Sequence, residues 1–262
     1  MSTPAFAHSP PLPTLPSSAE ELNHILPTTW EAVMLVPPQD AARWMLATAR
    51  LGHAGAQAVL GQWLLDGRGL ERDPVQALHW FLHAAQQNHP MGMNMAGRCH
   101  EQGWGTAVDA DKAAHWYRKA AATSLPEARY NLANLLASGQ GVTQDHAQAL
   151  ALYRQAAEQG YAKAFAKLGR YHEDGLLVEK DLAMAFLCYQ RGAEGGDFRG
   201  QFCYAGMLAA QGREAEALEW LAKVPETATP RYLRQAGEAL SQSPLPAFRA
   251  MGLQMLSRAT PA

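Results

Sequence analysis

The chain has 262 residues, of which 48% are hydrophobic and 18% charged, so its composition is that of a globular rather than a disordered protein. Its formal net charge of −2 argues against the basic surface expected of a general nucleic-acid binder. The 3 cysteines cannot form a disulfide framework. No charge-free apolar run approaches the roughly 20 residues of a membrane helix. We therefore expect a protein without membrane insertion in a reducing compartment, the cytoplasm.

The first predicted element is a proline-rich, flexible tail over residues 1–17. Five of the first 16 residues are proline, and residues 1–19 carry no charged side chain. A signal peptide begins with basic residues and continues as an unbroken apolar run, so this segment is not expected to be one. The alternative role for the tail is that of a polyproline ligand for another protein.

Residues 18–52 are predicted to form a degenerate capping repeat at the N-terminal side. The stretch Ser18-Ala19-Glu20-Glu21 offers a capping box for its first helix. Residues 40–52 are predicted to be its second helix, because Trp44 precedes Trp80 by 36 residues, the period of the repeat that follows.

A 36-residue period runs through the chain from residue 53 to residue 196. A glycine, an aspartate, an alanine and an aromatic residue each recur at a fixed place in successive copies, which is the signature of a repeat architecture. The predicted copies are 53–88, 89–124, 125–160 and 161–196. The recurring residues are Gly67, Gly103, Gly139 and Gly175; Asp73, Asp109, Asp145 and Asp181; Ala77, Ala113, Ala149 and Ala185; Phe81, Tyr117, Tyr153 and Tyr189.

Each copy is predicted to fold as helix, loop and helix. In the first copy the first helix runs from about Ala54 to Asp66, and Gly67 follows it as a left-handed cap. Gly69 supplies a second permissive position in the loop, and Asp73 is placed to cap the start of the second helix. That helix has an apolar stripe at i, i+3, i+4, i+7 and i+8, which is typical of a buried face. The stripe consists of Ala77, Trp80, Phe81, Ala84 and Ala85.

Small residues explain how the two helices of a copy pack. They recur in the first helix at Gly61, Gly97, Ala133 and Gly169, and they allow the helix axes to approach to about 8 Å. The aromatic column is then expected to bridge to the next pair, and Trp116 is expected to be buried because it shares a column with Trp44 and Trp80. Since no copy can bury its apolar face alone, the predicted fold is an all-α, right-handed α-solenoid of about six helix-turn-helix repeats.

After residue 196 the pattern continues in altered form. Residues 197–224 are predicted to be a shortened fifth repeat, in which a four-residue deletion removes the GxG loop. Residues 225–262 are predicted to be C-terminal capping helices, formed by 229–241 and 246–259. Atypical end units are expected of a solenoid.

The string from Ala54 to Asn88 resembles the Sel-one-like repeat (SLR), a relative of the tetratricopeptide repeat. The resemblance is carried in the first copy by Ala54, Ala56, Leu60, Gly61, Gly67, Gly69, Asp73, Ala77, Trp80, Ala84 and Ala85. It covers residues 53–196 strongly and most of 20–260 weakly. The tyrosine column of that family holds Leu64, His100, Leu136 and His172, and Leu177 replaces a loop glycine. These departures leave the predicted fold unchanged.

Motifs that could carry chemistry read better as parts of the repeat. The GxG loops follow a helix rather than a strand and lack the third glycine of a dinucleotide site, so they are predicted to be structural turns. His100-Glu101 and His172-Glu173 resemble half of a zinc-protease motif, but neither has a second histidine four residues on. We interpret these histidines as polar substitutes in the tyrosine column.

The best metal candidate in the sequence is the trio His79, His83 and His115. The first two stand four residues apart on one helix, and His115 occupies the place of His79 one copy later. They lie off the apolar stripe, so we predict solvated histidines and no metal or other cofactor. The cysteines Cys99, Cys188 and Cys203 are predicted to be buried small hydrophobes.

The predicted function is protein–protein interaction by an adaptor or scaffold, which the resemblance also implies. The partner is another protein or peptide, held in the concave groove. A dedicated chaperone or immunity-type binder of a secreted bacterial effector is the alternative, and a β-lactam-binding or hydrolysing enzyme, which some SLR proteins are described as, is less favoured because no nucleophile motif occurs. The predicted binding residues are a polar row on the first helices with its flanking charges: Gln62, Arg98, Glu101, Asn134, Lys163, Arg170 and Glu173.

Overall fold

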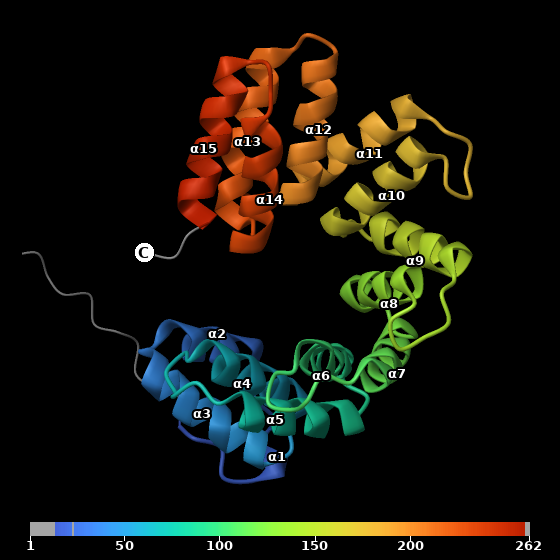
Figure 1. Cartoon of the computed structure of the whole chain (residues 1–262). Helices are drawn as coiled ribbons and strands as arrows, with labels where there is room; N and C mark the ends of the chain where they lie inside the picture. The colour runs from blue at the N-terminus through green and yellow to red at the C-terminus, as the bar shows by residue number, and fades with distance from the viewer. Residues whose placement is uncertain (1–13, 23, 260–262) are drawn as a thin grey trace, which may run out of the picture. The chain divides into compact units, whose positions relative to one another are not determined.

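The computed structural model describes residues 14–22 and 24–259, so most of the predicted tail lies outside the described residues. Within those ranges every regular element is an α-helix (Figure 1), which confirms the all-α class. The helices are α1 Ala19–Leu22, α2 Pro27–Leu35, α3 Pro38–Arg50, α4 Ala54–Asp66, α5 Pro74–Gln86, α6 Pro90–Gln102, α7 Ala110–Ala121, α8 Pro126–Ser138, α9 His146–Glu158, α10 Ala162–Asp174, α11 Leu182–Glu194, α12 Phe198–Ala210, α13 Glu214–Thr227, α14 Pro230–Ser241 and α15 Pro246–Ala259.

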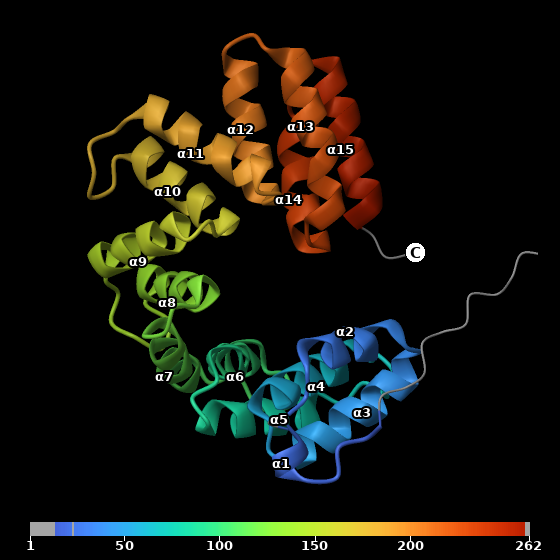
Figure 2. The same ribbon diagram turned by 180° about the vertical axis from the view of Figure 1, so that it is seen from behind.

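The chain divides into two compact units. Unit 1 contains α1 to α7, the start of α8 and the loop residues Gly139–Thr143, and unit 2 contains the remainder of α8 and α9 to α15. Inside each unit, helices that follow one another along the chain pack as pairs, as α4 does with α5 and α14 with α15. Figures 1 and 2 show the pairing of α14 with α15 from opposite sides.

The helix ends follow the predicted capping residues. Gly67 ends α4 in the left-handed conformation, with φ of 72°, and its counterparts Gly103 and Gly175 do the same for α6 and α10. Asp73 starts α5 by accepting hydrogen bonds from the backbone N–H groups of Val75 and Gln76. The same cap recurs at the start of α7, α9 and α11, from Asp109, Asp145 and Asp181.

The glycines of the first helices lie directly against the aromatic residues of the second helices. A Cβ atom added to Gly97 would lie 2.6 Å from the ring of Tyr117, and one added to Gly169 would lie 2.6 Å from the ring of Tyr189. The ring therefore occupies the space that a larger side chain on the first helix would need. The expected bridge to the next copy also occurs in unit 2, where the rings of Tyr153 and Tyr171 lie 6.1 Å apart.

In the first three copies, the second glycine of the loop lies on the start of the second helix of the preceding copy. A Cβ atom on Gly69 would collide with the carbonyl of Pro38, and one on Gly105 with the carbonyl of Pro74. We call the first residue of each second helix the loop seat, because the loop of the next copy lies on it. Since Pro38 is a loop seat, α3 is the second helix of a preceding unit, as its tryptophan register predicted.

The tryptophan column is less buried than expected. Trp44 is 1% exposed, whereas Trp80 and Trp116 are only half-buried. The ring of Trp116 lies under the ammonium group of Lys119, at 5.1 Å, near the surface of α7. The expectation of a fully buried Trp116 is therefore wrong, because the chain around Trp44 covers that ring whereas Trp116 keeps one side open to solvent.

The C-terminal part of unit 2 departs from the repeat as the deletion predicted. Three residues, Gln211–Arg213, connect α12 directly to α13, so the fifth copy has no GxG loop. The predicted boundary at residue 224 falls inside α13, which continues through Pro225 to Thr227. Pro225 is tolerated because it lies in the last turn of that helix.

Candidate functional site

The predicted polar row is distributed over both units. In unit 1, Gln62 donates to the carboxylate of Asp66 at 2.9 Å, and the guanidinium of Arg98 lies 5.0 Å from the ring of Trp104. In unit 2, Lys163 is exposed, and Arg170 donates to Asp174 at 2.6 Å.

Three members of the row, Glu101, Asn134 and Glu173, accept hydrogen bonds from tyrosines of their own copies. The hydroxyl of Tyr117 donates to Glu101 at 2.7 Å, and in unit 2 the hydroxyl of Tyr189 donates to Glu173 at 2.7 Å. A third such bond joins Tyr153 to Asn134 at 2.8 Å. In the first copy phenylalanine replaces the tyrosine and Leu65 stands at the place of the glutamate, so donor and acceptor are lost together.

These bonds give the polar residues a second role, since each closes the pair of helices that forms one copy. Burial raises the pKa of Tyr117 far above its usual range, and the charge of Glu101 raises it further. The hydroxyl therefore stays protonated and serves as a donor. The predicted role of Glu101, Asn134 and Glu173 in binding a partner stays a prediction. A partner that contacts them would meet side-chain oxygens that already accept hydrogen bonds from tyrosines.

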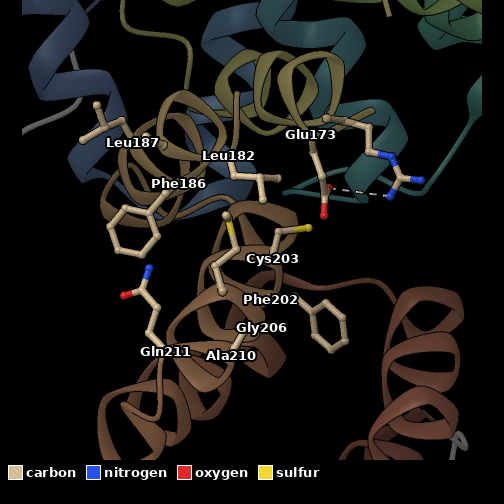
Figure 3. Close-up of a pocket in the computed structure, with 12 residues that line it drawn as sticks. Glu173, Leu182, Phe186, Leu187, Phe202, Cys203, Gly206, Ala210 and Gln211 are labelled. Atoms are coloured by element: carbon tan, nitrogen blue, oxygen red, sulfur yellow. Dashed lines mark ion pairs between the residues drawn. The ribbon is translucent and has the colours of Figure 1, made fainter. Parts of the chain in front are cut away.

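A pocket of about 890 Å³ opens in unit 2 between α10, α11 and α12, and we call it the unit-2 pocket. Figure 3 shows Glu173 of α10 and Leu182 of α11 on one side, with Gly206 and Ala210 of α12 on the other. Most of its wall is apolar, and its polar edge comes from Arg170 and Glu173, 3.9 Å apart. The remaining lining residues are Ala183, Phe186, Leu187, Phe202, Cys203, Met207 and Gln211.

The start of α11 is unusually apolar and exposed for its place in the repeat. Leu182 is 52% exposed and Leu187 is 51% exposed. In the earlier copies, the place of Leu182 holds Pro74, Ala110 and His146. The place of Leu187 holds His79, His115 and Ala151. Phe186 is half-buried, whereas its counterparts Leu78, Ala114 and Leu150 are buried. Exposed apolar side chains that cluster in this way mark an interaction site more often than scattered ones do.

Two sequence changes account for the pocket. The fifth copy lacks the loop that would cover the seat at Leu182, because only Gln211–Arg213 connect α12 to α13. Gly206 stands where the other copies place the polar row residue, and a Cβ atom there would meet nothing within 4 Å. One change uncovers α11 and the other hollows α12, so an apolar surface is left open to solvent.

The thiol of Cys203 forms part of the pocket wall. Burial raises its pKa to about 11. A thiol with this pKa is protonated near neutral pH and is a poor nucleophile. Cys203 is half-buried and contributes an apolar surface to the pocket, whereas Cys99 and Cys188 are buried as predicted.

A second apolar pocket, of about 550 Å³, lies in unit 1. His53 and His89 line it, and both cap helices: the Nδ1 atom of His53 accepts from the N–H of Ala56 at 3.0 Å, and that of His89 from the N–H of Gly92 at 3.3 Å. Burial lowers the pKa of both rings. Gln62 of the predicted row lines this pocket, with Trp30, Gly55, Ala58, Val59, Met91 and Met95.

The three histidines of the metal candidate lie on exposed helix faces. The Nε2 atoms of His79 and His83 lie 3.1 Å apart on the exposed face of α5, and His115 is exposed on α7. Across residues 14–22 and 24–259, no group of three or more histidine, cysteine, aspartate or glutamate side chains is arranged to hold a metal ion. His100 is buried in the tyrosine column. None of the described helices is both long enough and apolar enough to cross a bilayer.

The apolar residues of the unit-2 pocket were not among the predicted site residues. Leu182, Phe186 and Leu187 read as members of an ordinary apolar helix when the sequence is taken alone. The signal that could have found them is the column comparison, because the equivalent places in the other copies are small or polar, or buried. The missing loop gives the same indication independently.

Fold and site together define a protein built of tandem helix-loop-helix repeats with a solvent-open apolar pocket. A model of the Sel1 repeat matches residues 54–89, 90–122, 126–161 and 162–197, more than half of the chain. The chain therefore belongs to the Sel1 repeat family, and its fold is a helical solenoid with repeats of about 36 residues. No curated protein matches the chain.

Solved structures of Sel1 repeat proteins are similar to this chain. One is a Sel1 repeat protein from Oxalobacter formigenes, with 26% identity, a TM-score of 0.70, and coverage of 92% of this chain and 98% of that one. Another is c5321, a protective antigen of uropathogenic Escherichia coli with an SLR fold, with 26% identity and a TM-score of 0.62. The match covers 91% of this chain and 54% of the antigen, so the chain spans about half of that protein.

The fold also resembles that of the immunity protein Pa5087 from Pseudomonas aeruginosa, with 20% identity and a TM-score of 0.50. That match covers 95% of this chain and 85% of the immunity protein. At this identity the similarity shows a shared fold.

Proposed function

We propose that this protein binds a segment of another protein and that the unit-2 pocket is its binding site. The observation that carries the proposal is the exposed apolar start of α11, with Leu182 and Leu187 each about half exposed. A contiguous apolar concavity with a few polar groups at its edge is the usual form of a recognition site. Membership of a family whose repeats usually mediate protein binding supports the same proposal.

The polar edge of the pocket favours one orientation of a bound segment. Arg170 is exposed and holds Asp174 and Glu173 through its guanidinium, so these charges are fixed beside the apolar wall. A partner that places a backbone carbonyl or a carboxylate at this edge accepts hydrogen bonds from the oriented guanidinium of Arg170. In this proposal Arg170 and Glu173 are contact residues, Lys163 and Asn134 are secondary, and Gln62, Arg98 and Glu101 belong to a separate surface on unit 1.

The biological role that fits this site is that of an adaptor or scaffold in the cytoplasm. A dedicated chaperone or immunity-type binder of a secreted bacterial effector is the alternative, and the Pseudomonas protein with a similar fold is named an immunity protein. The two roles differ in the number of partners rather than in the chemistry of the pocket. An enzymatic role such as β-lactam hydrolysis is less favoured, because the sequence contains no nucleophile motif such as G-x-S-x-G.

Site-specific photo-crosslinking tests the proposal. A benzoylphenylalanine residue at position 187 should give discrete crosslinked products in a lysate of the source organism, identified by mass spectrometry. The same residue at position 118, where Arg118 is exposed on α7, is the matched control and should not give those products. One stoichiometric product would favour a dedicated binder, and several would favour an adaptor. Identical products from both positions would contradict the proposed site.

The contribution of the predicted polar residues to binding is tested by one substitution in each unit. Arg170→Ala should weaken binding of a partner captured at position 187 by about 1–3 kcal/mol, the range of a significant interface residue. Arg98→Ala tests whether the separate surface on unit 1 contributes to binding of the same partner. Unchanged affinity for Arg170→Ala would remove the polar edge from the proposed site.

A further inference from the structure

We infer that the occupant of the unit-2 pocket is an extended, glycine-containing segment with a bulky apolar side chain. The GxG loops of the first three copies each lie on the start of the second helix of the preceding copy. The occupant would lie in the same way on the start of α11, the second helix of the fourth copy. This inference rests on the proposed function and specifies the partner segment that the same site recognises.

The occupied loop seats define the shape of such a segment. Gly105 lies so close to the carbonyl of Pro74 that a Cβ atom would collide with it. Trp104, beside it in the loop, is half-buried against the apolar core of unit 1. This loop therefore combines a glycine at the point of closest approach with an adjacent apolar side chain that packs against the core of unit 1.

Two further seats repeat the arrangement with different loops. Gly69 lies on the carbonyl of Pro38, and Gly141 lies on the backbone of Ala110. The residues between the two loop glycines differ in each copy: Arg68, Trp104 and Gln140. The glycine beside the seat is the feature that these three loops share, and in each of them it has a steric reason. The fourth copy holds Leu177 at the equivalent place, with φ of 58°.

The seat at the start of α11 is apolar and uncovered. Leu182 and Ala183 occupy the places of Pro74 and Val75, and both are exposed and line the pocket. The three-residue connection after α12 leads directly into α13 and supplies no loop. The pocket therefore begins at the place where a covering loop would lie.

The hollow beside this seat explains why the segment needs a bulky apolar residue. Gly206 leaves open space on α12, and Phe186, Phe202 and Met207 line the same pocket. An apolar side chain in this hollow removes its own surface and the surface of these three residues from water, which favours binding. Occupation would also cover Leu182 and Leu187.

A peptide copied from an existing loop is the direct probe. The fluorescein-labelled peptide QGWGTAVD has the sequence of residues 102–109, which include both loop glycines and Trp104. Fluorescence anisotropy with the full chain should show saturable binding. The same peptide with valine in place of its second glycine should bind at least about tenfold more weakly, because the collision with the seat costs more than one order of magnitude in affinity.

A pocket-filling variant keeps the test specific. Gly206→Leu places its Cβ atom where nothing lies within 4 Å, so the substitution requires no shift of the α12 backbone at this atom. It should reduce peptide affinity about tenfold or more, as expected from the loss of one buried apolar contact. Ala151→Leu is the matched control, because position 151 is exposed on α9 in the column of Leu187, and it should leave affinity unchanged. Circular dichroism of both variants verifies that they fold.

A graft tests the inference without any partner. Replacing Gln211–Arg213 with the seven residues 103–109 restores a loop to the fifth copy. We expect this loop to cover Leu182, raise the thermal midpoint and abolish peptide binding. Peptide binding that persists in the graft and in Gly206→Leu, or equal binding of the glycine and valine peptides, would overturn the inference. If position 187 crosslinks a partner but the peptide does not bind, the inference fails and the proposed function stands.

Discussion

Replacing Gly105 with alanine probes the contact on which the stacking of the loops depends. Gly105 has φ of 72°, and a Cβ atom at this position would collide with the carbonyl of Pro74. Two costs should therefore add. The left-handed conformation costs an alanine about 1–2 kcal/mol, and the collision displaces the loop.

The second cost, from displacement of the loop, arises because the loop also contains Trp104. Displacement of the loop separates Trp104 from the apolar core of unit 1, where it is half-buried. Loss of part of that contact costs about 1.5–3 kcal/mol. We therefore expect Gly105→Ala to lower the free energy of unfolding by about 2.5–5 kcal/mol in total.

Gly52→Ala is the matched control, because it carries the first cost without the second. Gly52 also belongs to unit 1, has φ of 95°, and would place a Cβ atom where nothing lies within 4 Å. It should cost about 1–2 kcal/mol. Urea denaturation followed by far-ultraviolet circular dichroism measures both variants against the wild type. Equal losses of stability would refute the close approach of the loop to its seat.

Two further predictions concern hydrogen bonds. Tyr117→Phe should destabilise the protein by about 1–2 kcal/mol, because Glu101 loses its donor in a half-buried place; an unchanged urea midpoint would show that the bond is not formed in solution. Acidification should destabilise unit 1, because burial lowers the pKa values of the capping residues His53 and His89 in the folded state. As pH falls, the unfolded state therefore takes up protons before the folded state does. The free energy of unfolding should decrease as pH falls below about 6.5. Asparagine at both positions keeps a cap without titrating and should flatten the dependence of the thermal midpoint on pH between 7.5 and 5, whereas an unaltered dependence would assign it to other groups.

The repeating part of the fold could be predicted from the sequence because one pattern occurs four times. Agreement between the capping aspartate, the left-handed glycine and the apolar stripe fixed the helices closely, and α4 runs from Ala54 to Asp66 as predicted. The end units were less predictable, since only one copy of each pattern exists. Thus α13 continues to Thr227, past the predicted boundary.

The site was harder to predict, for two physical reasons. Polar residues on the first helices can serve a partner or the fold itself, and the bonds from Tyr117 to Glu101 and from Tyr189 to Glu173 depend on distances that a helical pattern does not contain. The joint change to Phe81 and Leu65 in the first copy is the sequence signal of that bond. Exposure of Leu182 depends on a loop absent one copy later, which periodicity within a single helix does not reveal.

The affinity of a purified partner for pocket variants tests the central claim most directly. The partner identified by crosslinking at position 187 would be titrated against the wild type, Gly206→Leu and Ala151→Leu by isothermal titration calorimetry. If the unit-2 pocket is the binding site, Gly206→Leu binds about tenfold or more weakly, as expected for one lost apolar contact, and Ala151→Leu binds like the wild type. Equal affinity for all three proteins would contradict the account.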